Sequence, residues 1–365
     1  MDEAVTDCRP LNVIVLTPTM GGADGISEMT RQWVRVLESQ AGREVGTLDV
    51  WSLDDPARPV AAGAGTGFRT ARGGRMRFAS FALREAAHAA NDTLVIVMHL
   101  QLLPVALPLV LRGARLMVIL MGIEAWQPLS RLQRLAFGRA WKVAAISTHT
   151  VARFHRANPT LADVPITLCR PGAPLMARPS DGHIAGPYAL IVARMSVSER
   201  YKGHDALIEL WPRVRQAVPG ARLVIAGDGD DADRLRQKAG ALCGDAFVFA
   251  GRIGDADLAA LYRDAAFFVM PSTDEGFGLV YLEAMSASTP CIAAHGAPEE
   301  IIDDGVDGVI VDAGNRDELL GAMTRLFIDQ PLRARMAAAA VERVRREFSP
   351  AALAARVCDV LELSC

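Results

Sequence analysis

The sequence predicts an α/β protein with two doubly wound parallel sheets, one following the other along the chain. Short apolar runs alternate with longer amphipathic segments throughout the 365 residues. The runs are apolar at consecutive positions, which is typical of parallel strands that are covered on both faces. The alternation stops once, in a stretch rich in proline and glycine at 171–187, and then resumes. Alternation that restarts after a linker predicts two domains of this class.

The first domain is expected over 1–170, the linker over 171–187 and the second domain over 188–348. The tail, 349–365, begins with Ser349 and Pro350, which favour an N-cap and the first helical position. We expect it to form a helix that packs back on the first domain. Strands are expected at 12–16, 93–99, 116–121, 143–147, 188–194, 221–227, 246–251, 266–271 and 290–294.

The composition excludes several classes of protein. With 51% hydrophobic and 22% charged residues, the chain is able to bury a large core. A net charge of -3 gives no basic field for nucleic acid. The cysteines occur singly, without a C-x-x-C pair, which favours a reduced, cytoplasmic setting and no zinc site. The longest apolar run, 102–111, is too short and too rich in proline for a membrane span.

A short basic stretch at 68–78 holds Arg69, Arg72, Arg75 and Arg77. One interpretation is a solvated loop and helix start. The other is a patch that faces anionic lipid or a phosphate-bearing acceptor. With the apolar segment 102–111, these arginines would suit peripheral contact with an anionic membrane, at the inner face, where a lipid-linked acceptor lies.

Glycines follow the first expected strand, in "PTMGGADGISEM". Gly21, Gly22 and Gly25 stand between this strand and a helix. Glycines there let the backbone approach an anion, and a helix N-terminus attracts negative charge. The spacing is neither G-x-G-x-x-G nor a Walker motif, so a plain strand-to-helix turn is the alternative.

Two cations and two acids follow strands of the second domain. Arg194 and Lys202 come after its first strand, where they would clamp a diphosphate. In "TDEGFGLVYLEAM", Glu275 precedes a helix and Glu283 lies inside it, with a G-x-G turn between them. Such a turn forms an anion site at a helix N-terminus. Carboxylates accept paired hydrogen bonds from sugar hydroxyls.

Taken in order, these stretches resemble the retaining glycosyltransferases of family 4, which have the GT-B fold. The matching segments are "GGADGIS", "RMSVSERYKG", the "GDG" after the next strand and the E-x7-E of "EGFGLVYLE". A fifth, "GAPEEIIDDGVDGVIV", resembles a late Gly-x-Pro-Glu segment and hairpin of the family. The resemblance covers nearly the whole chain and is strongest over 188–312.

The resemblance implies two Rossmann-like domains that face a central cleft. Residues 1–170 would bind the acceptor and 188–348 the nucleotide sugar. Arg194 and Lys202 would neutralise the leaving diphosphate, Glu275 would hold the donor sugar, and Glu283 the ribose. The other donor contacts that it implies are Gly22, Arg252, Ile253, Gly276, Phe277, Gly278 and Leu279.

Two further side chains end strands of the first domain. His99 closes the run "TLVIVMH", and relatives often carry a histidine at such a strand end, near the donor sugar. Whether it acts as a base or only positions the sugar stays open, and a core or capping histidine is the alternative. Glu124 holds a similar position after the next strand and is expected to contact the acceptor.

The implied reaction moves a hexose, with retention and without a metal, from GDP-mannose or a UDP-hexose to a glycan or lipid-linked glycan. Surface or exopolysaccharide biosynthesis is the implied setting. A nucleotide-sugar epimerase on the same fold and a non-catalytic sugar-binding relative are alternatives. An NAD-dependent oxidoreductase would use "GDGDDA", but the acid expected about 20 residues later is missing. A metal-dependent transferase would use Asp228 and Asp230, on a single mixed-sheet domain.

Overall fold

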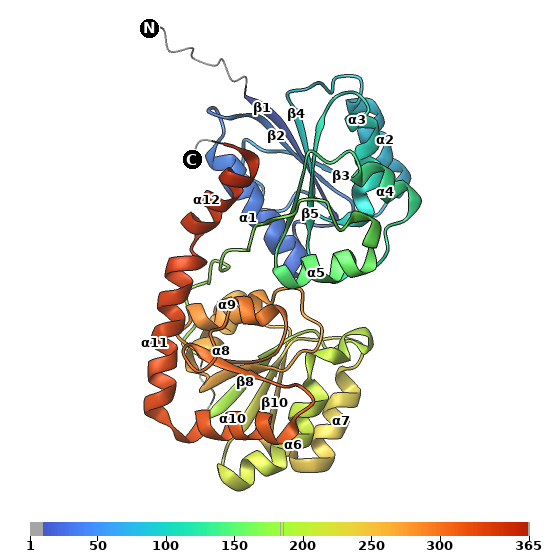
Figure 1. Cartoon of the computed structure of the whole chain (residues 1–365). Helices are drawn as coiled ribbons and strands as arrows, with labels where there is room; N and C mark the ends of the chain where they lie inside the picture. The colour runs from blue at the N-terminus through green and yellow to red at the C-terminus, as the bar shows by residue number, and fades with distance from the viewer. Residues whose placement is uncertain (1–9, 183, 185, 364–365) are drawn as a thin grey trace. The chain divides into compact units, whose positions relative to one another are not determined.

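The computed structural model describes residues 10–182, 184 and 186–363, and the chain in it divides into two compact units. Unit 1 contains Met1–Gly172 and Pro350–Cys365, and unit 2 contains Ala173–Ser349. Each unit holds one parallel sheet with helices around it (Figure 1). The structure therefore confirms the predicted fold class of two doubly wound parallel sheets.

The sheet of unit 1 has the order β3-β2-β1-β4-β5-β6-β7. The first strand lies inside the sheet, and the order reverses between β1 and β4. Ligands of open parallel sheets bind at such a switch point, beyond the carboxyl ends of the strands. The strands are β1 (Leu11–Thr17), β2 (Val45–Ser52), β3 (Gly67–Thr70), β4 (Thr93–Val97), β5 (Arg115–Leu120), β6 (Lys142–Ala145) and β7 (Thr167–Leu168).

The helices of unit 1 begin at residues that satisfy their first N–H groups. Asp24 caps α1 by accepting from the N–H groups of Ile26 and Ser27. The last helix, α12, starts at Pro350 and contacts α1 (Figure 1, red and blue). The α-helices are α1 (Gly25–Ser39), α2 (Arg75–Glu85), α3 (Leu103–Val110), α4 (Arg131–Phe137), α5 (Thr148–Ala157) and α12 (Pro350–Leu361), and the 3₁₀ turns are η1 (Leu100–Leu102), η2 (Ile123–Trp126) and η3 (Pro159–Leu161).

The sheet of unit 2 has the order β10-β9-β8-β11-β12-β13. Its order reverses between β8 and β11, which places a second switch point there. The strands are β8 (Tyr188–Val192), β9 (Arg222–Ala226), β10 (Phe247–Gly251), β11 (Phe267–Met270), β12 (Cys291–Ala294) and β13 (Gly308–Val311). The α-helices are α6 (His204–Ala217), α7 (Ala232–Cys243), α8 (Asp255–Asp264), α9 (Leu279–Ser286), α10 (Arg316–Ile328) and α11 (Gln330–Glu347), and the 3₁₀ turns are η4 (Val197–Lys202), η5 (Gly244–Ala246) and η6 (Ala297–Glu300).

Four strands were not predicted: β2, β3, β7 and β13. No continuous apolar run marks β2, where Thr47 and Asp49 interrupt it, or β3, whose sequence GFRT has a single large apolar residue. The strand β7 is only two residues long. The predicted hairpin around "DDGVDGVIV" is wrong. Those residues form a turn and then the single strand β13, which pairs in parallel with β12.

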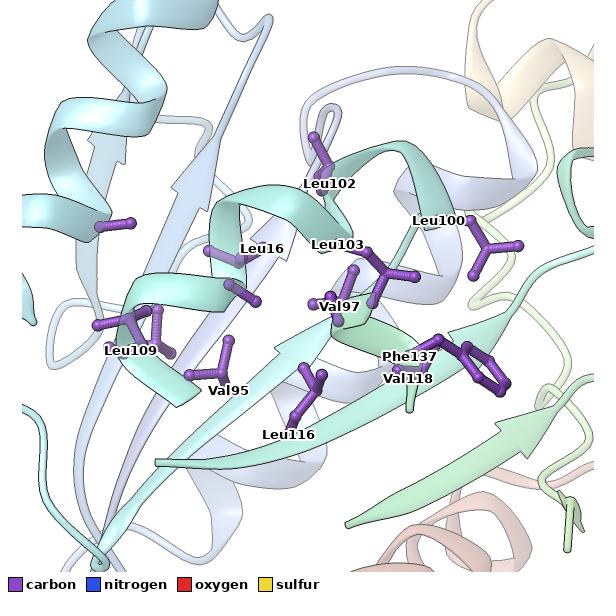
Figure 2. Packing of buried hydrophobic residues seen from close by; sticks show 14 of the residues in the cluster. Leu16, Val95, Val97, Leu100, Leu102, Leu103, Leu109, Leu116, Val118 and Phe137 are labelled. Atoms are coloured by element: carbon purple, nitrogen blue, oxygen red, sulfur yellow. The ribbon is translucent and has the colours of Figure 1, made fainter. Parts of the chain in front are cut away.

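The apolar segment 102–111 is core and does not provide the membrane-facing surface that the sequence suggested. Leu103, Ala106 and Leu109 of α3 are fully buried. Figure 2 shows Leu103 and Leu109 beside β4 and β5, whose valines and leucines belong to the same cluster. Pro104 lies in the first turn of α3 and Pro108 lies inside the helix, which continues to Val110. Only Leu111, after the helix, is largely exposed, at 62%.

The arginine stretch is divided between fold and surface. Arg69 lies in β3, where its guanidinium pairs with Glu85 at 3.0 Å and lies 5.3 Å from the ring centre of Trp51. It therefore stabilises unit 1. Arg72, Arg75 and Arg77 are exposed, so they alone are available for the predicted surface patch.

A pair of leucine substitutions tests the placement of α3. Leu109→Ala should lower the free energy of unfolding by about 2–5 kcal/mol because it leaves a cavity in the core. Leu111→Ala removes the same atoms from an exposed position and should change it by less than about 0.5 kcal/mol. Urea unfolding measures both. Equal effects of the two substitutions would contradict the buried position of α3.

Candidate active site

The candidate site of unit 2 is assembled at the switch point between β8 and β11. Arg194 and Lys202 follow β8, and Glu275 and Glu283 follow β11. Since β8 and β11 are neighbours in the sheet, the connections after them leave the same edge side by side. The topology thus brings together the four charged residues that the sequence predicted for the donor.

The turn after β8 is held in place by contacts with the turn after β11. Gly203 has a φ of 90°, and a Cβ there would lie 2.7–3.1 Å from atoms of Pro271. The N–H of Thr273 donates to the carbonyl of Tyr201 at 3.1 Å. Only glycine fits so close an approach at a positive φ. These contacts fix Lys202 beside the segment that carries Glu275.

Lys202 and Glu275 form a direct ion pair. The ammonium Nζ lies 2.6 Å from Glu275 Oε2, and the two side chains are only 15% and 13% exposed. Arg194 lies nearer the solvent, with 68% of its side chain exposed, and pairs with Glu199 at 2.6 Å. The sequence predicted separate tasks for Lys202 and Glu275, whereas the structure pairs them directly.

The turn before α9 is closely packed, with Gly276, Phe277 and Gly278 all buried. Gly278 has a φ of 99°, and a Cβ there would lie 2.5 Å from the ring of Tyr281. Phe277 is 2% exposed, and its ring packs against Phe348. The side chain of Phe277 is therefore part of the core, and the predicted donor contact of its backbone stays a prediction. The N–H groups that open a helix have no partners within it, so the start at Leu279 suits an anion.

Glu283 is held by a residue that the sequence analysis missed. Tyr262, at the end of α8, donates its hydroxyl to Glu283 Oε2 at 2.7 Å. Tyr262 is 0% exposed, and burial raises the pKa of its hydroxyl well above the ordinary value. It therefore remains a donor. A tyrosine in an amphipathic helix gives no sequence signal for this task.

The GDGDD stretch after β9 has a structural role. Cβ atoms at Gly227 and Gly229 would lie 2.1 and 2.2 Å from the carbonyls of Ala193 and Met195. The chain after β8 is thus packed against these glycines. Asp230 accepts from the N–H of Val197 at 2.9 Å, which links this loop to the start of η4.

Asp231 holds the turn after β8 in place. It is 3% exposed and accepts hydrogen bonds from Arg200, in η4, and Arg234, in α7. Arg234 also pairs with Asp205 at the start of α6. The paired guanidinium of Arg234 holds the pKa of Asp205 at about 2. Asp231 therefore ties the turn that ends in Lys202 to two helices, a role that the sequence analysis did not foresee.

Arg252 and Ile253 follow β10, two strands away from β8. Arg252 is exposed and Ile253 is half-buried. They lie at the carboxyl edge of the sheet, as the prediction for the base required, but nothing in the structure tests that contact. Among the described residues, no three His, Cys, Asp or Glu side chains gather as a metal ion would need.

In unit 1, the loop that contains Gly22 binds the carboxylate of Asp55. Asp55 accepts from the N–H groups of Met20 and Gly21 at 2.7 and 3.0 Å. The N–H of Gly22 donates to the hydroxyl of Thr19 at 3.2 Å. These donors thus have partners within the loop. A Cβ at Gly22 would lie 2.5 Å from Asp24, so the glycine also serves the close turn into α1.

His99 caps the turn η1 at the end of β4. Its Nδ1 accepts from the N–H of Gln101 at 3.2 Å, and burial lowers its pKa. The ring is therefore neutral, with its proton on Nε2. Such a ring donates from Nε2, which favours positioning a hydroxyl or oxygen over acting as a base.

Glu124 closes the turn after β5. Its Oε1 accepts from the N–H of Met121 at 2.7 Å. Burial raises the pKa of this carboxyl to about 7, although backbone hydrogen bonds oppose the shift. Glu124 thus has a structural role in the turn beside the predicted acceptor contact, which stays a prediction.

The comparisons with known proteins agree with the predicted family. Residues 186–343 match the family described as glycosyl transferases group 1. The GDP-mannose-dependent alpha-(1-6)-phosphatidylinositol monomannoside mannosyltransferase of Mycobacterium tuberculosis is 36% identical over 171 residues, 44% of this chain and 44% of that protein. Phosphatidyl-myo-inositol mannosyltransferase of Mycobacterium leprae is 37% identical over 150 residues, 40% of each chain. The match thus spans less than half the length of these relatives.

Solved structures match over more of the chain. HepE of Anabaena, in complex with UDP and glucose, has a TM-score of 0.76 at 19% identity and covers 96% of this chain and 99% of that one. Sucrose-phosphate synthase of Thermosynechococcus elongatus has 0.74 at 22%, covering 96% and 98%. These likenesses show the fold, which is GT-B. Residues 186–343 thus match the glycosyl transferases group 1 family, in agreement with the family 4 resemblance that the motifs carry.

The pKa of Glu124 predicts a pH dependence of stability. Because the folded carboxyl has a pKa of about 7 and an ordinary one about 4.5, the folded state binds more protons between these values. Stability therefore falls as the pH rises through this window. Glu124→Gln retains an oxygen for the Met121 N–H and cannot ionise. It should be more stable than the wild type at pH 8, and this gain should shrink towards zero as the pH falls to about 4.5.

Urea unfolding at several pH values measures this difference. A gain in stability that is the same at every pH would contradict the assigned cause.

Proposed function

We propose that this protein is a retaining hexosyltransferase that uses a nucleoside diphosphate sugar and needs no metal. The observation that carries the proposal is the Lys202–Glu275 pair, at 2.6 Å, beside the start of α9 at the switch point of unit 2. A cation, a carboxylate and a helix N-terminus lie close together here. The cation and the helix N-terminus suit the diphosphate and the negative charge that develops on it as it leaves. The carboxylate suits the hydroxyls of the hexose.

The catalytic roles follow from charge. In this proposal the diphosphate replaces Glu275 as the ion-pair partner of Lys202. It also accepts hydrogen bonds from the first N–H groups of α9. Arg194 contributes a second cation from the solvent side. Fixed positive groups aimed at a developing negative charge lower the barrier without reorganisation. Glu275, once released, accepts hydrogen bonds from the hexose hydroxyls.

GDP-mannose is the proposed donor. Support comes from the named relatives, since the Mycobacterium tuberculosis protein at 36% identity is described as GDP-mannose-dependent. A UDP-hexose is the alternative, because HepE, similar in fold, was solved with UDP and glucose. The base would lie by the backbone of Arg252 and Ile253. Because no side chain would read the base there, this contact does not select between guanine and uracil.

The proposed acceptor is a lipid-linked glycan or related glycolipid, bound by unit 1 near His99 and Glu124. The curated relatives above are described as acting on phosphatidylinositol mannoside or phosphatidyl-myo-inositol. The exposed Arg72, Arg75 and Arg77 suit contact with an anionic membrane surface. None of the helices that the structure describes has the length and apolar character needed to span a bilayer.

Replacing the cation of the pair tests the function. Lys202→Gln should lower kcat/KM for hexose transfer roughly 10²- to 10³-fold, because a charge aimed at the leaving group is lost. Arg213→Gln is the matched control, since it removes a cation from an exposed pair with Asp317, with side chains 53% and 81% exposed. It should stay within about twofold.

The assay follows transfer of labelled mannose from GDP-mannose to extracted glycolipid, with UDP-glucose as the second donor and EDTA present throughout. Transfer by the wild type in EDTA, lost in Lys202→Gln alone, is the expected result. Undiminished transfer by Lys202→Gln would refute the site. Activity that requires an added divalent cation would refute metal independence.

A further inference from the structure

We propose that Tyr262 is a positioning residue that sets the orientation of Glu283 and thereby the preference of the donor site for ribose over deoxyribose. The inference rests on the proposed function, and it takes Glu283 as the group that binds the ribose of the nucleotide, the role that the family resemblance implies. Its basis is the hydrogen bond from the Tyr262 hydroxyl to Glu283 Oε2, at 2.7 Å.

The hydrogen bond joins two elements that leave the sheet separately. Tyr262 lies near the end of α8, and Glu283 lies in the second turn of α9. The ring of Tyr262 is 0% exposed and lies 5.8 Å from the ring centre of Phe268. Its backbone carbonyl accepts from the hydroxyl of Thr289, which precedes β12. The tyrosine is thus fixed at both ends, and its hydroxyl position is set by the core.

The direction of this hydrogen bond follows from burial. A buried phenol hydroxyl needs a partner, and a carboxylate is the strongest acceptor available. Since burial keeps the phenol protonated, Tyr262 donates and Glu283 accepts. The hydrogen bond therefore restrains the Glu283 carboxylate at Oε2. A carboxylate is a group that accepts hydrogen bonds from sugar hydroxyls.

A fixed carboxylate can discriminate between sugars that differ by one hydroxyl. A site built to accept a hydroxyl proton rejects the analogue that lacks it, because the buried acceptor is left without its partner. A carboxylate that rotates has other ways to satisfy its oxygens and loses part of this discrimination. Tyr262 therefore affects the ratio of affinities for ribonucleotide and deoxyribonucleotide more than either affinity alone.

A purely structural role for Tyr262 makes a different prediction. Tyr262→Phe keeps the ring and its packing and removes only the hydroxyl. Tyr281 offers a matched control in α9. It is also 0% exposed, and its hydroxyl donates to the carbonyl of Met270 at 2.6 Å. If loss of a buried hydroxyl acts only through stability, Tyr281→Phe and Tyr262→Phe should behave alike.

The experiment is calorimetric titration of the wild type, Tyr262→Phe and Tyr281→Phe with GDP and 2′-deoxy-GDP, and with UDP and 2′-deoxy-UDP. We expect the wild type to prefer the ribonucleotide by at least about tenfold. Tyr262→Phe should reduce this preference about three- to tenfold, and Tyr281→Phe should leave it within twofold. Thermal unfolding confirms that each variant is folded.

A double variant separates action through Glu283 from other effects. In a Glu283→Gln background, the further change Tyr262→Phe should not alter the preference. A preference retained by Tyr262→Phe, or lost equally in Tyr281→Phe, overturns the inference and leaves the proposed function intact. If the wild type binds no nucleoside diphosphate, the proposed function fails and the inference fails with it.

Discussion

The close approach of two connections in unit 2 is the constraint on which the candidate site depends. Gly203 lies against Pro271 where a side chain would not fit, and this contact brings Lys202 to within 2.6 Å of Glu275. An exposed ion pair contributes little to stability, but two side chains that are mostly buried interact more strongly. In the structure, each charge of the pair satisfies the other. Because of this geometry, Glu275 competes with any anion that binds Lys202.

Much of unit 2 serves to keep this approach in place. The glycines at 227 and 229 allow the chain after β8 to pack against the loop after β9. Asp231 then binds Arg200 and Arg234, so that η4, which ends in Lys202, is tied to α7 and, through Asp205, to α6. On the other side, Tyr262 fixes Glu283 within α9. Arg194, Lys202 and Glu275 thus lie on the connections after the strands, while Glu283 lies within α9, where Tyr262 of α8 orients it.

The sequence predicted the two sheets, because continuous apolar runs are a strong local signal. It also predicted that Arg194, Lys202 and Glu275 follow strands and that Glu283 lies in the helix after the G-x-G turn. It did not predict β2, where Thr47 and Asp49 break the apolar run. It assigned 102–111 to a surface, because an apolar run alone does not reveal whether it faces core or lipid. It missed Tyr262 and Asp231, since a tyrosine or an aspartate becomes a positioning residue only through contacts distant in sequence. It foresaw neither the Lys202–Glu275 pair nor the carboxylate of Asp55 in the Gly22 loop.

The competition between Glu275 and a diphosphate for Lys202 is the central claim, and the affinity of Glu275→Gln for GDP tests it most directly. The substitution keeps the shape of the side chain and removes the charge that holds Lys202 at 2.6 Å. Calorimetry should show GDP binding that is several-fold tighter than in the wild type, with the difference shrinking as salt is added. Weaker or unchanged binding of GDP by Glu275→Gln would contradict the account.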